Sequence, residues 1–301
     1  MFLGGTLDCT AFKITEDKSF KQTYEATGDA LGGTNVDSAF LEFLDQVFGK
    51  PVMDFARTNQ PSDWLKLLVN FDLAKRSVRN KAEDRMNIEI PYGIHEAVRD
   101  FTGKKLADHV RDAGIAGLRC QSGSIVLGHE AIQNIFKKAI DGIITHMKTL
   151  MDAPELDNID YVLMVGGFSA SMILQDAVRE VFKYRAQVLI PHDATLSVLK
   201  GAVLFGHNPR IVTSRIARLT YADGTAEKYD PIKHGESRAR VVITDRGERQ
   251  SKIARTWVKR GDTIHIGQVI EFSLVPSESN KKVMTHYLYS SEKKEVEYTD
   301  E

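Results

Sequence analysis

Three pairs of adjacent glycines stand where a predicted strand gives way to a loop. They are Gly4-Gly5, Gly32-Gly33 and Gly166-Gly167. Because glycine has no Cβ, its backbone N–H can approach an anion closely. Helices expected after the second and third pairs would add their positive N-terminal ends, and Thr6 and Asp8 follow the first pair. A single pair usually only turns the chain, but three in this order predict a cleft that holds the phosphates of a nucleotide.

A group of charged residues shares one face of a predicted helix over residues 61–79. These are Asp72, Lys75, Arg76 and Arg79, at the spacing i, i+3, i+4, i+7. A carboxylate can accept hydrogen bonds from ribose hydroxyls, an ammonium can neutralise phosphate, and a guanidinium can stack on a purine. The alternative is a solvated face with an internal ion pair. Beside the glycine loops, we favour nucleotide binding.

Hydrophobic periodicity predicts the elements that position these residues. Residues 2–14 and 20–27 form a hairpin, and a helix begins after Gly33 with Thr34 or Asn35 as its cap. The remaining predicted elements are a long helix over 129–151, a buried strand over 160–165 that ends at Gly166, a strand over 187–190 and a helix over 193–206.

The chain changes character near residue 208. Long helical periods disappear, and short alternating stretches such as RVVIT and RTWVKRG replace them. The sequence therefore predicts two domains. Residues 1–207 form an α/β domain with a mixed sheet, and residues 208–301 form a small β-rich domain.

Composition and charge argue against nucleic-acid binding and membrane insertion. The 301 residues carry a formal net charge of -1, which gives no general support for nucleic-acid binding. Residues 209–260 hold 13 basic and 6 acidic side chains, which we interpret as a solvated surface. There is no apolar run of about 20 residues and no visible signal peptide, and the two cysteines are far apart. We expect a cytoplasmic protein that binds neither nucleic acid nor membrane.

Five ordered motifs resemble the actin-fold (ribonuclease H-like) ATPase domain of the seventy-kilodalton heat-shock proteins, most closely their divergent twelfth subfamily. FLGGTLD resembles the second phosphate loop, and TGDALGGTNVD resembles the segment that follows it. FDLAKRSVR is similar to the adenosine-binding helix, VLMVGGFSAS to the strand and loop under adenine, and IPHDATLSVLKGAVLFG to the closing helix. The resemblance covers residues 1 to about 207 and implies the second lobe of that domain, with ATP or ADP as ligand and Mg2+ bridging the phosphates.

The resemblance implies a role for each matched position. The phosphate-binding positions are Gly4, Gly5, Thr6, Asp8, Gly32 and Gly33, with Asp8 also reaching the metal indirectly through water. The adenosine-binding positions are Asp72, Lys75, Arg76, Gly166 and Gly167, with Asp72 in place of a longer glutamate. The sequence singles out no catalytic residue.

Three departures from the family pattern affect the expected activity. Met1 stands where the family has an aspartate that organises the metal, Leu3 replaces a glycine, and Ala170 replaces an arginine that stacks on adenine. The family's first lobe has no counterpart in these residues, so we expect a chain that lacks that lobe. Phosphoryl transfer depends on groups positioned from both sides. We therefore expect ATP hydrolysis from the complete family domain and little or none from this chain alone.

The tail resembles the first strands of the family's peptide-binding sandwich through RTWVKRGDTIHIGQVIEFSLV. The resemblance implies a chaperone-related protein with a possible protein or peptide partner at this domain. Two alternatives stay open: an interaction module that keeps the fold without nucleotide, and a sugar or acyl kinase. The kinase is the weaker, because no additional acid stands where such an enzyme places its base.

Overall fold

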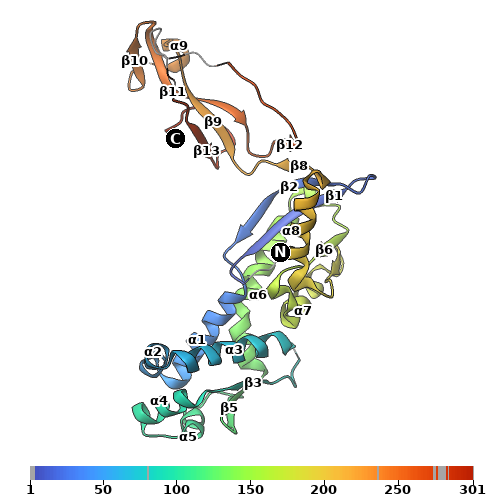
Figure 1. Ribbon diagram of the computed structural model, residues 1–301, viewed down its shortest axis with the longest axis vertical. Helices are drawn as coiled ribbons and strands as arrows, with labels where there is room; N and C mark the ends of the chain where they lie inside the picture. Colours follow the sequence, from blue (N-terminus) through green and yellow to red (C-terminus); the bar gives the residue numbers. More distant parts are fainter. Residues whose placement is uncertain are drawn as a thin grey trace. The chain divides into compact units, whose positions relative to one another are not determined.

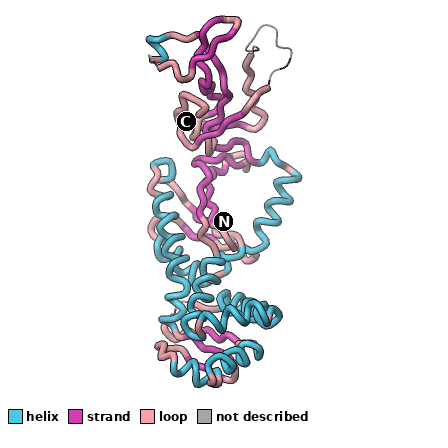
Figure 2. The backbone as a smooth tube through the Cα atoms, turned by 90° about the vertical axis from the view of Figure 1, so that its left-hand side faces the viewer, coloured by secondary structure: helices cyan, strands magenta, loops and turns pink. Residues whose placement is uncertain are grey.

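The computed structural model describes residues 4–79, 81–235, 237–273, 276, 283 and 285–300. The chain divides into two compact units. The first comprises Met1–Cys9 and Thr27–Leu204, and the second comprises Thr10–Ala26 and Phe205–Glu301. Helices predominate in the first unit and strands in the second (Figure 2). The mixed α/β class predicted from the sequence is therefore confirmed, while Met1 and Leu3 lie outside the described residues.

Three consecutive helices begin the first unit (Figure 1). They are α1 (Gly33–Phe48), α2 (Lys50–Asn59) and α3 (Pro61–Ser77). α1 buries Val36, Phe40, Leu44 and Val47 on one face, and Phe40 stacks on Phe71 of α3 with ring centroids 3.8 Å apart. The N-cap of α1 is Gly32 rather than Thr34 or Asn35, and the Asn35 side chain instead accepts the Gly32 N–H at 2.9 Å.

A small antiparallel sheet with two helices follows and was not predicted. Its strands are β3 (Met86–Glu89), β5 (Ser124–Leu127) and β4 (Arg119–Gln121), in that order, and its helices are α4 (Tyr92–Thr102) and α5 (Leu106–Asp112). These elements are too short to leave a hydrophobic period over several turns. Ile88, Ile94 and Ile125 are fully buried and join this part to the core of the first unit.

The long predicted helix is confirmed as α6 (His129–Met151), which packs against α1. The rest of the first unit contains short elements. They are η1 (Pro154–Leu156), β6 (Tyr161–Leu163), η2 (Gly167–Ala170), α7 (Met172–Phe182), β7 (Gln187–Leu189) and α8 (Ala194–His207), whose last residues pass into the second unit.

The expectation of a buried strand at residues 160–165 is wrong for β6. Tyr161 and Leu163 are both more than half exposed. β6 pairs in parallel with β7 alone among the described strands. Two paired strands form only a narrow sheet, and its face that carries Tyr161 and Leu163 remains exposed to solvent.

The hairpin of β1 (Leu7–Ile14) and β2 (Phe20–Asp29) is confirmed, and residues 10–26 of it belong to the second unit. There β2 pairs in parallel with β8 (Val212–Ile216), which pairs with β12 (Thr263–His265). A second sheet has the order β10-β11-β9-β13. These strands are β10 (Val241–Thr244), β11 (Gly247–Val258), β9 (Thr220–Lys228) and β13 (Leu288–Ser291), and the unit also holds η3 (Pro209–Ile211) and α9 (Pro231–His234).

Within the described part of the chain, no helix has the length and apolar character required to cross a membrane.

Candidate nucleotide site

The three glycine pairs meet at the N-terminal end of α1. Gly32 lies directly against the first pair, because a Cβ on Gly32 would come within 2.5 Å of the Gly4 carbonyl oxygen and 2.7 Å of the Thr6 nitrogen. The Thr34 N–H also donates to the Gly4 carbonyl at 2.7 Å. Phe168, beside the third pair, lies against Gly33, where a Cβ would meet its ring at 3.6 Å.

Not all of these glycines are explained by internal packing. A Cβ at Gly4, Gly5 or Gly167 would meet no described atom within 4 Å. Open space beside a backbone turn leaves room for a ligand to approach the main chain. In contrast, Gly32 is required by its contact with the loop. Gly166 has φ of 102°, a conformation that favours glycine, and its N–H donates to the Ala194 carbonyl at 2.9 Å.

The helix expected after the second glycine pair follows it directly, whereas the α-helix expected after the third pair begins only beyond a short 3-10 helix. At α1, the Thr34 N–H and the Gly32 N–H both have partners within the protein. After Gly166-Gly167 the chain forms the short helix η2, and α7 begins only at Met172. The main chain of Gly4, Gly5 and Gly167 therefore remains the more accessible surface for an anion.

Thr6 directly precedes β1 and Asp8 is the second residue of that strand, beside this loop. The Thr6 hydroxyl donates to Oδ2 of Asp8 at 3.0 Å, which orients the carboxylate. In the described residues, no group of three or more His, Cys, Asp or Glu side chains gathers as a metal site. Mg2+ commonly keeps several waters and binds through one or two carboxylates and the substrate's phosphates. A single carboxylate at this position fits that pattern.

Lys75 is the centre of a charged cluster between α3 and α1. It is only 8% exposed, and its ammonium lies 2.5 Å from an Asp37 oxygen and 3.1 Å from an Asp72 oxygen. Arg76 reaches the other Asp72 oxygen at 2.6 Å. The sequence spacing therefore places Asp72, Lys75 and Arg76 together as predicted. Arg79 does not continue this face, because α3 ends at Ser77.

Helix α1 connects the charged cluster to the glycine loops. Asp37 lies four residues beyond Gly33, which corresponds to about 6 Å along the helix axis. The loops and the buried ammonium are thus held by one rigid element. Asp37 and Phe168 were missed as site residues by sequence reasoning. The only signal for Asp37 was its place at the end of the GGTNVD stretch, since its contact with Lys75 is not local.

Comparison with known proteins identifies the relatives of this chain. No family model matches it. Heat shock 70 kDa protein 12A of Homo sapiens and that of Mus musculus are each 28% identical to it over 297 residues, which is 98% of this chain and 44% of theirs. Heat shock 70 kDa protein 12B of Homo sapiens is 28% identical over 289 residues, 95% of this chain and 42% of its own length.

The chain is similar, over nearly its whole length, to members of the twelfth subfamily of seventy-kilodalton heat-shock proteins. The predicted resemblance is confirmed, and it extends through the β-rich unit. The chain spans less than half the length of the curated relatives that it matches. Heat-shock proteins of this type generally bind ATP or ADP with Mg2+, and the open loop with its oriented carboxylate fits such a ligand.

Lys75→Met tests the cluster of this heat-shock-protein relative. We expect the free energy of unfolding to fall by about 1–2 kcal/mol, because Asp37 would lose its cation and Asp72 would keep only Arg76. The fall is limited because both carboxylates are about a third exposed to water. Urea denaturation measures it.

Lys66→Met is the matched control on the same helix. Lys66 pairs with Asp63 at 3.1 Å but is largely exposed, so its loss should change stability by less than about 0.5 kcal/mol. Equal losses for the two variants would contradict a structural role for the buried cation.

Proposed function

We propose that this chain is a chaperone-related, cytoplasmic protein that binds ATP and ADP through the second-lobe half of an actin-like ATPase site. The observation that supports this proposal most strongly is the meeting of the glycine loops at α1, one helical turn from the Asp37–Lys75 pair. The relatives are named as heat shock 70 kDa proteins, which also supports the proposal.

In this proposal the phosphates lie along Gly4, Gly5 and Thr6, with Gly32 and Gly33 behind the loop. Asp8 contacts Mg2+ through water. Backbone N–H groups and the Thr6 hydroxyl would supply hydrogen bonds to phosphate oxygens without a large entropic cost, because β1 and α1 already fix them. Mg2+ held there would supply positive charge to offset that of the phosphates.

The adenosine lies along Asp72, Lys75 and Arg76, with Gly166 and Gly167 on the adenine side. Asp72 is partly exposed and can accept hydrogen bonds from ribose hydroxyls. The Arg76 guanidinium is about half exposed and presents a flat face on which a purine can stack. Lys75 is buried and paired, so its role is to hold Asp72 and Asp37 in place rather than to contact phosphate directly.

We further propose that the chain hydrolyses ATP slowly or not at all by itself. The groups that we assign to the phosphates are backbone amides, one hydroxyl and one carboxylate, and these assigned residues include no lysine or arginine. Phosphoryl transfer requires cations and an oriented water around the transferring phosphate. Binding without efficient turnover is the expected result of this set of groups.

Isothermal titration calorimetry with ADP and with ATP, each with Mg2+, tests the proposal. We expect one site with a Kd of roughly 0.01–1 mM, corresponding to about 4–7 kcal/mol of binding free energy. Gly5→Ala should weaken binding by about tenfold without lowering the melting temperature, because its Cβ meets only open space. An absence of heat at millimolar nucleotide, or rapid phosphate release from ATP, would overturn the respective part of the proposal.

A second candidate is a protein-interaction module that has the fold and no nucleotide. Strand β10 favours it, because β10 is an edge strand whose Ile243 is 83% exposed. An exposed edge can pair with a strand or peptide from a partner. If partner binding and melting temperature are unchanged by ATP and by substitution of Lys75 and Arg76, this candidate replaces the first.

A further inference from the structure

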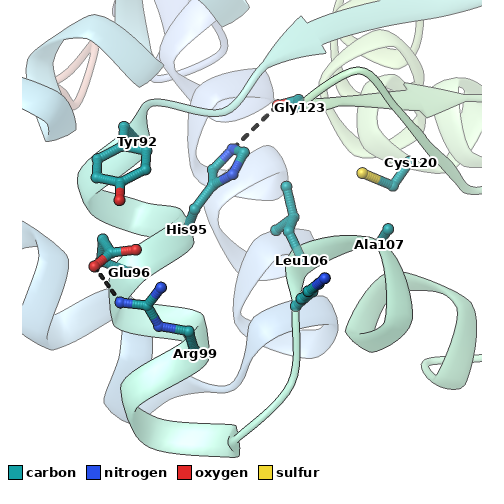
Figure 3. Close-up of a pocket in the computed structure, with 9 residues that line it drawn as sticks. Tyr92, His95, Glu96, Arg99, Leu106, Ala107, Cys120 and Gly123 are labelled. Carbon is teal, nitrogen blue, oxygen red and sulfur yellow. Dashed lines mark hydrogen bonds and ion pairs between the residues drawn. The ribbon is translucent and has the colours of Figure 1, made fainter.

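A separate cavity of ≈ 300 Å³ lies in the first unit, between α4 on one side and β4 with the start of α5 on the other (Figure 3). None of the residues of the nucleotide site lines it. The lining consists of Tyr92, His95, Glu96, Arg99, Lys105, Leu106, Ala107, Cys120 and Gly123. This volume is at the lower end of the range for small-molecule sites.

The charge of the lining favours an anion. Arg99 and Lys105 contribute two positive charges and Glu96 one negative charge, which leaves a net charge of +1. Arg99 and Glu96 form an ion pair (Figure 3), so the Arg99 charge is partly satisfied. The Lys105 ammonium has no partner among the described residues. It is the cation most available to a ligand.

The imidazole of His95 is fixed at the wall of the cavity. Its Nε2 lies 2.8 Å from the Ile90 carbonyl oxygen and 3.3 Å from that of Gly123. Carbonyl oxygens only accept hydrogen bonds, so Nε2 carries a hydrogen and the ring cannot rotate freely. Gly123 has φ of 81°, and a Cβ there would come within 3.3 Å of the His95 ring. The backbone turn at Gly123 therefore packs closely against the His95 ring.

The remaining lining is apolar or aromatic. Leu106 is buried, and Ala107 and Cys120 add two small apolar surfaces, opposite the Tyr92 and His95 rings on α4 (Figure 3). These rings have centroids 6.4 Å apart and a tilt of 30°. Such a surface suits a small, flat, apolar molecule that carries a charged group at one end.

We propose that this cavity binds a small organic carboxylate, with the carboxylate at Lys105 and Arg99 and the apolar body against Leu106, Ala107 and Cys120. A neutral ligand would leave the Lys105 charge uncompensated, and an inorganic anion would leave the apolar lining unused. The proposal does not depend on nucleotide binding.

Protection of Cys120 from iodoacetamide tests the proposal, with benzoate as the probe and benzamide as its neutral counterpart. Burial raises the pKa of the Cys120 thiol, so alkylation is measured at about pH 8.5, where thiolate is present. At a benzoate concentration about twice its Kd, occupancy should slow alkylation about threefold. Cys9, the other free thiol, serves as the internal control and should react at an unchanged rate.

Three variants test whether the protection depends on the charges that line the cavity. Lys105→Gln should abolish the protection by benzoate. Lys104→Gln should not, because the neighbouring Lys104 pairs with Asp112 at 2.8 Å and does not line the cavity. Glu96→Gln releases Arg99 and should lower the benzoate concentration needed for half protection. Equal protection by benzamide, no protection by benzoate, or protection that survives Lys105→Gln would each overturn the proposal.

Discussion

Replacing Gly32 with alanine is expected to lower the free energy of unfolding of the first unit by about 3 kcal/mol, near the upper end of overpacking costs. The added Cβ would lie 2.5–2.7 Å from the Gly4 carbonyl oxygen, the Gly5 carbonyl carbon and the Thr6 nitrogen. All three are backbone atoms, so no flexible side chain can move aside. Either α1 or the loop must shift, and the Thr34-to-Gly4 hydrogen bond would be strained or lost.

The same substitution should also reduce ADP affinity at least about tenfold, because the loop that we assign to phosphate would move. Urea denaturation followed by circular dichroism measures the first effect, and calorimetry with ADP and Mg2+ measures the second. Gly5→Ala separates them: it should keep stability within about 0.5 kcal/mol and lose only affinity. A Gly32→Ala chain that matches the parent in both measurements would show that the loop does not rest on α1.

The second large effect is expected from Asp223→Ala in β9. Asp223 is fully buried, and its Oδ1 accepts hydrogen bonds from Arg255 Nε at 2.9 Å and from Trp257 Nε1 at 3.2 Å. Its Oδ2 accepts a further bond from the Arg255 guanidinium. Truncation would leave the Arg255 guanidinium without its carboxylate partner. Breaking a fully buried pair typically costs about 3–5 kcal/mol, and because the guanidinium is about a third exposed we expect the lower end of that range, about 3 kcal/mol.

Urea denaturation followed by Trp257 fluorescence measures this loss in the second unit, in a Trp64→Phe background that leaves one tryptophan. Asp300→Ala is the matched control. Asp300 also holds two cations, Arg240 at 3.0 Å and Lys252 at 3.1 Å, but it is partly exposed, so its loss should be much smaller. Similar losses for both aspartates would contradict the importance of burial at Asp223.

Acid should destabilise the second unit through the same carboxylate. Burial alone would raise the pKa of Asp223, but the bonds from Arg255 and Trp257 outweigh it, so the pKa lies below its ordinary value. A lowered carboxyl pKa stabilises the folded state above the unfolded pKa of about 3.9, and this stability is lost as the pH falls through the folded pKa. We expect the unfolding free energy to lose the Asp223 contribution only below about pH 4, and Asp223→Asn should flatten that part of the pH profile.

Much of the fold could be predicted because its signals are local. The apolar periods of α1, α3 and α6 extend over several turns, and α6 has the predicted bounds of residues 129–151. The region around β3, α4 and β5 could not be predicted, because its elements span one to three turns or a few residues each. The prediction that β6 is buried was wrong, because the burial of a strand depends on neighbouring strands and covering helices. A run of apolar residues does not specify these neighbours.

The candidate site shows the same division. Residue type and spacing alone predicted that three glycine pairs, together with Asp72, Lys75 and Arg76, form a nucleotide site. The resemblance to the seventy-kilodalton heat-shock proteins came from five ordered motifs. Only the tertiary structure decided which glycine is required by packing and which leave open space. It also decided that Lys75 is neutralised by Asp37, 38 positions away in the chain. Spacing constrains side chains within one helix, whereas contacts between elements arise only when the core has packed them together.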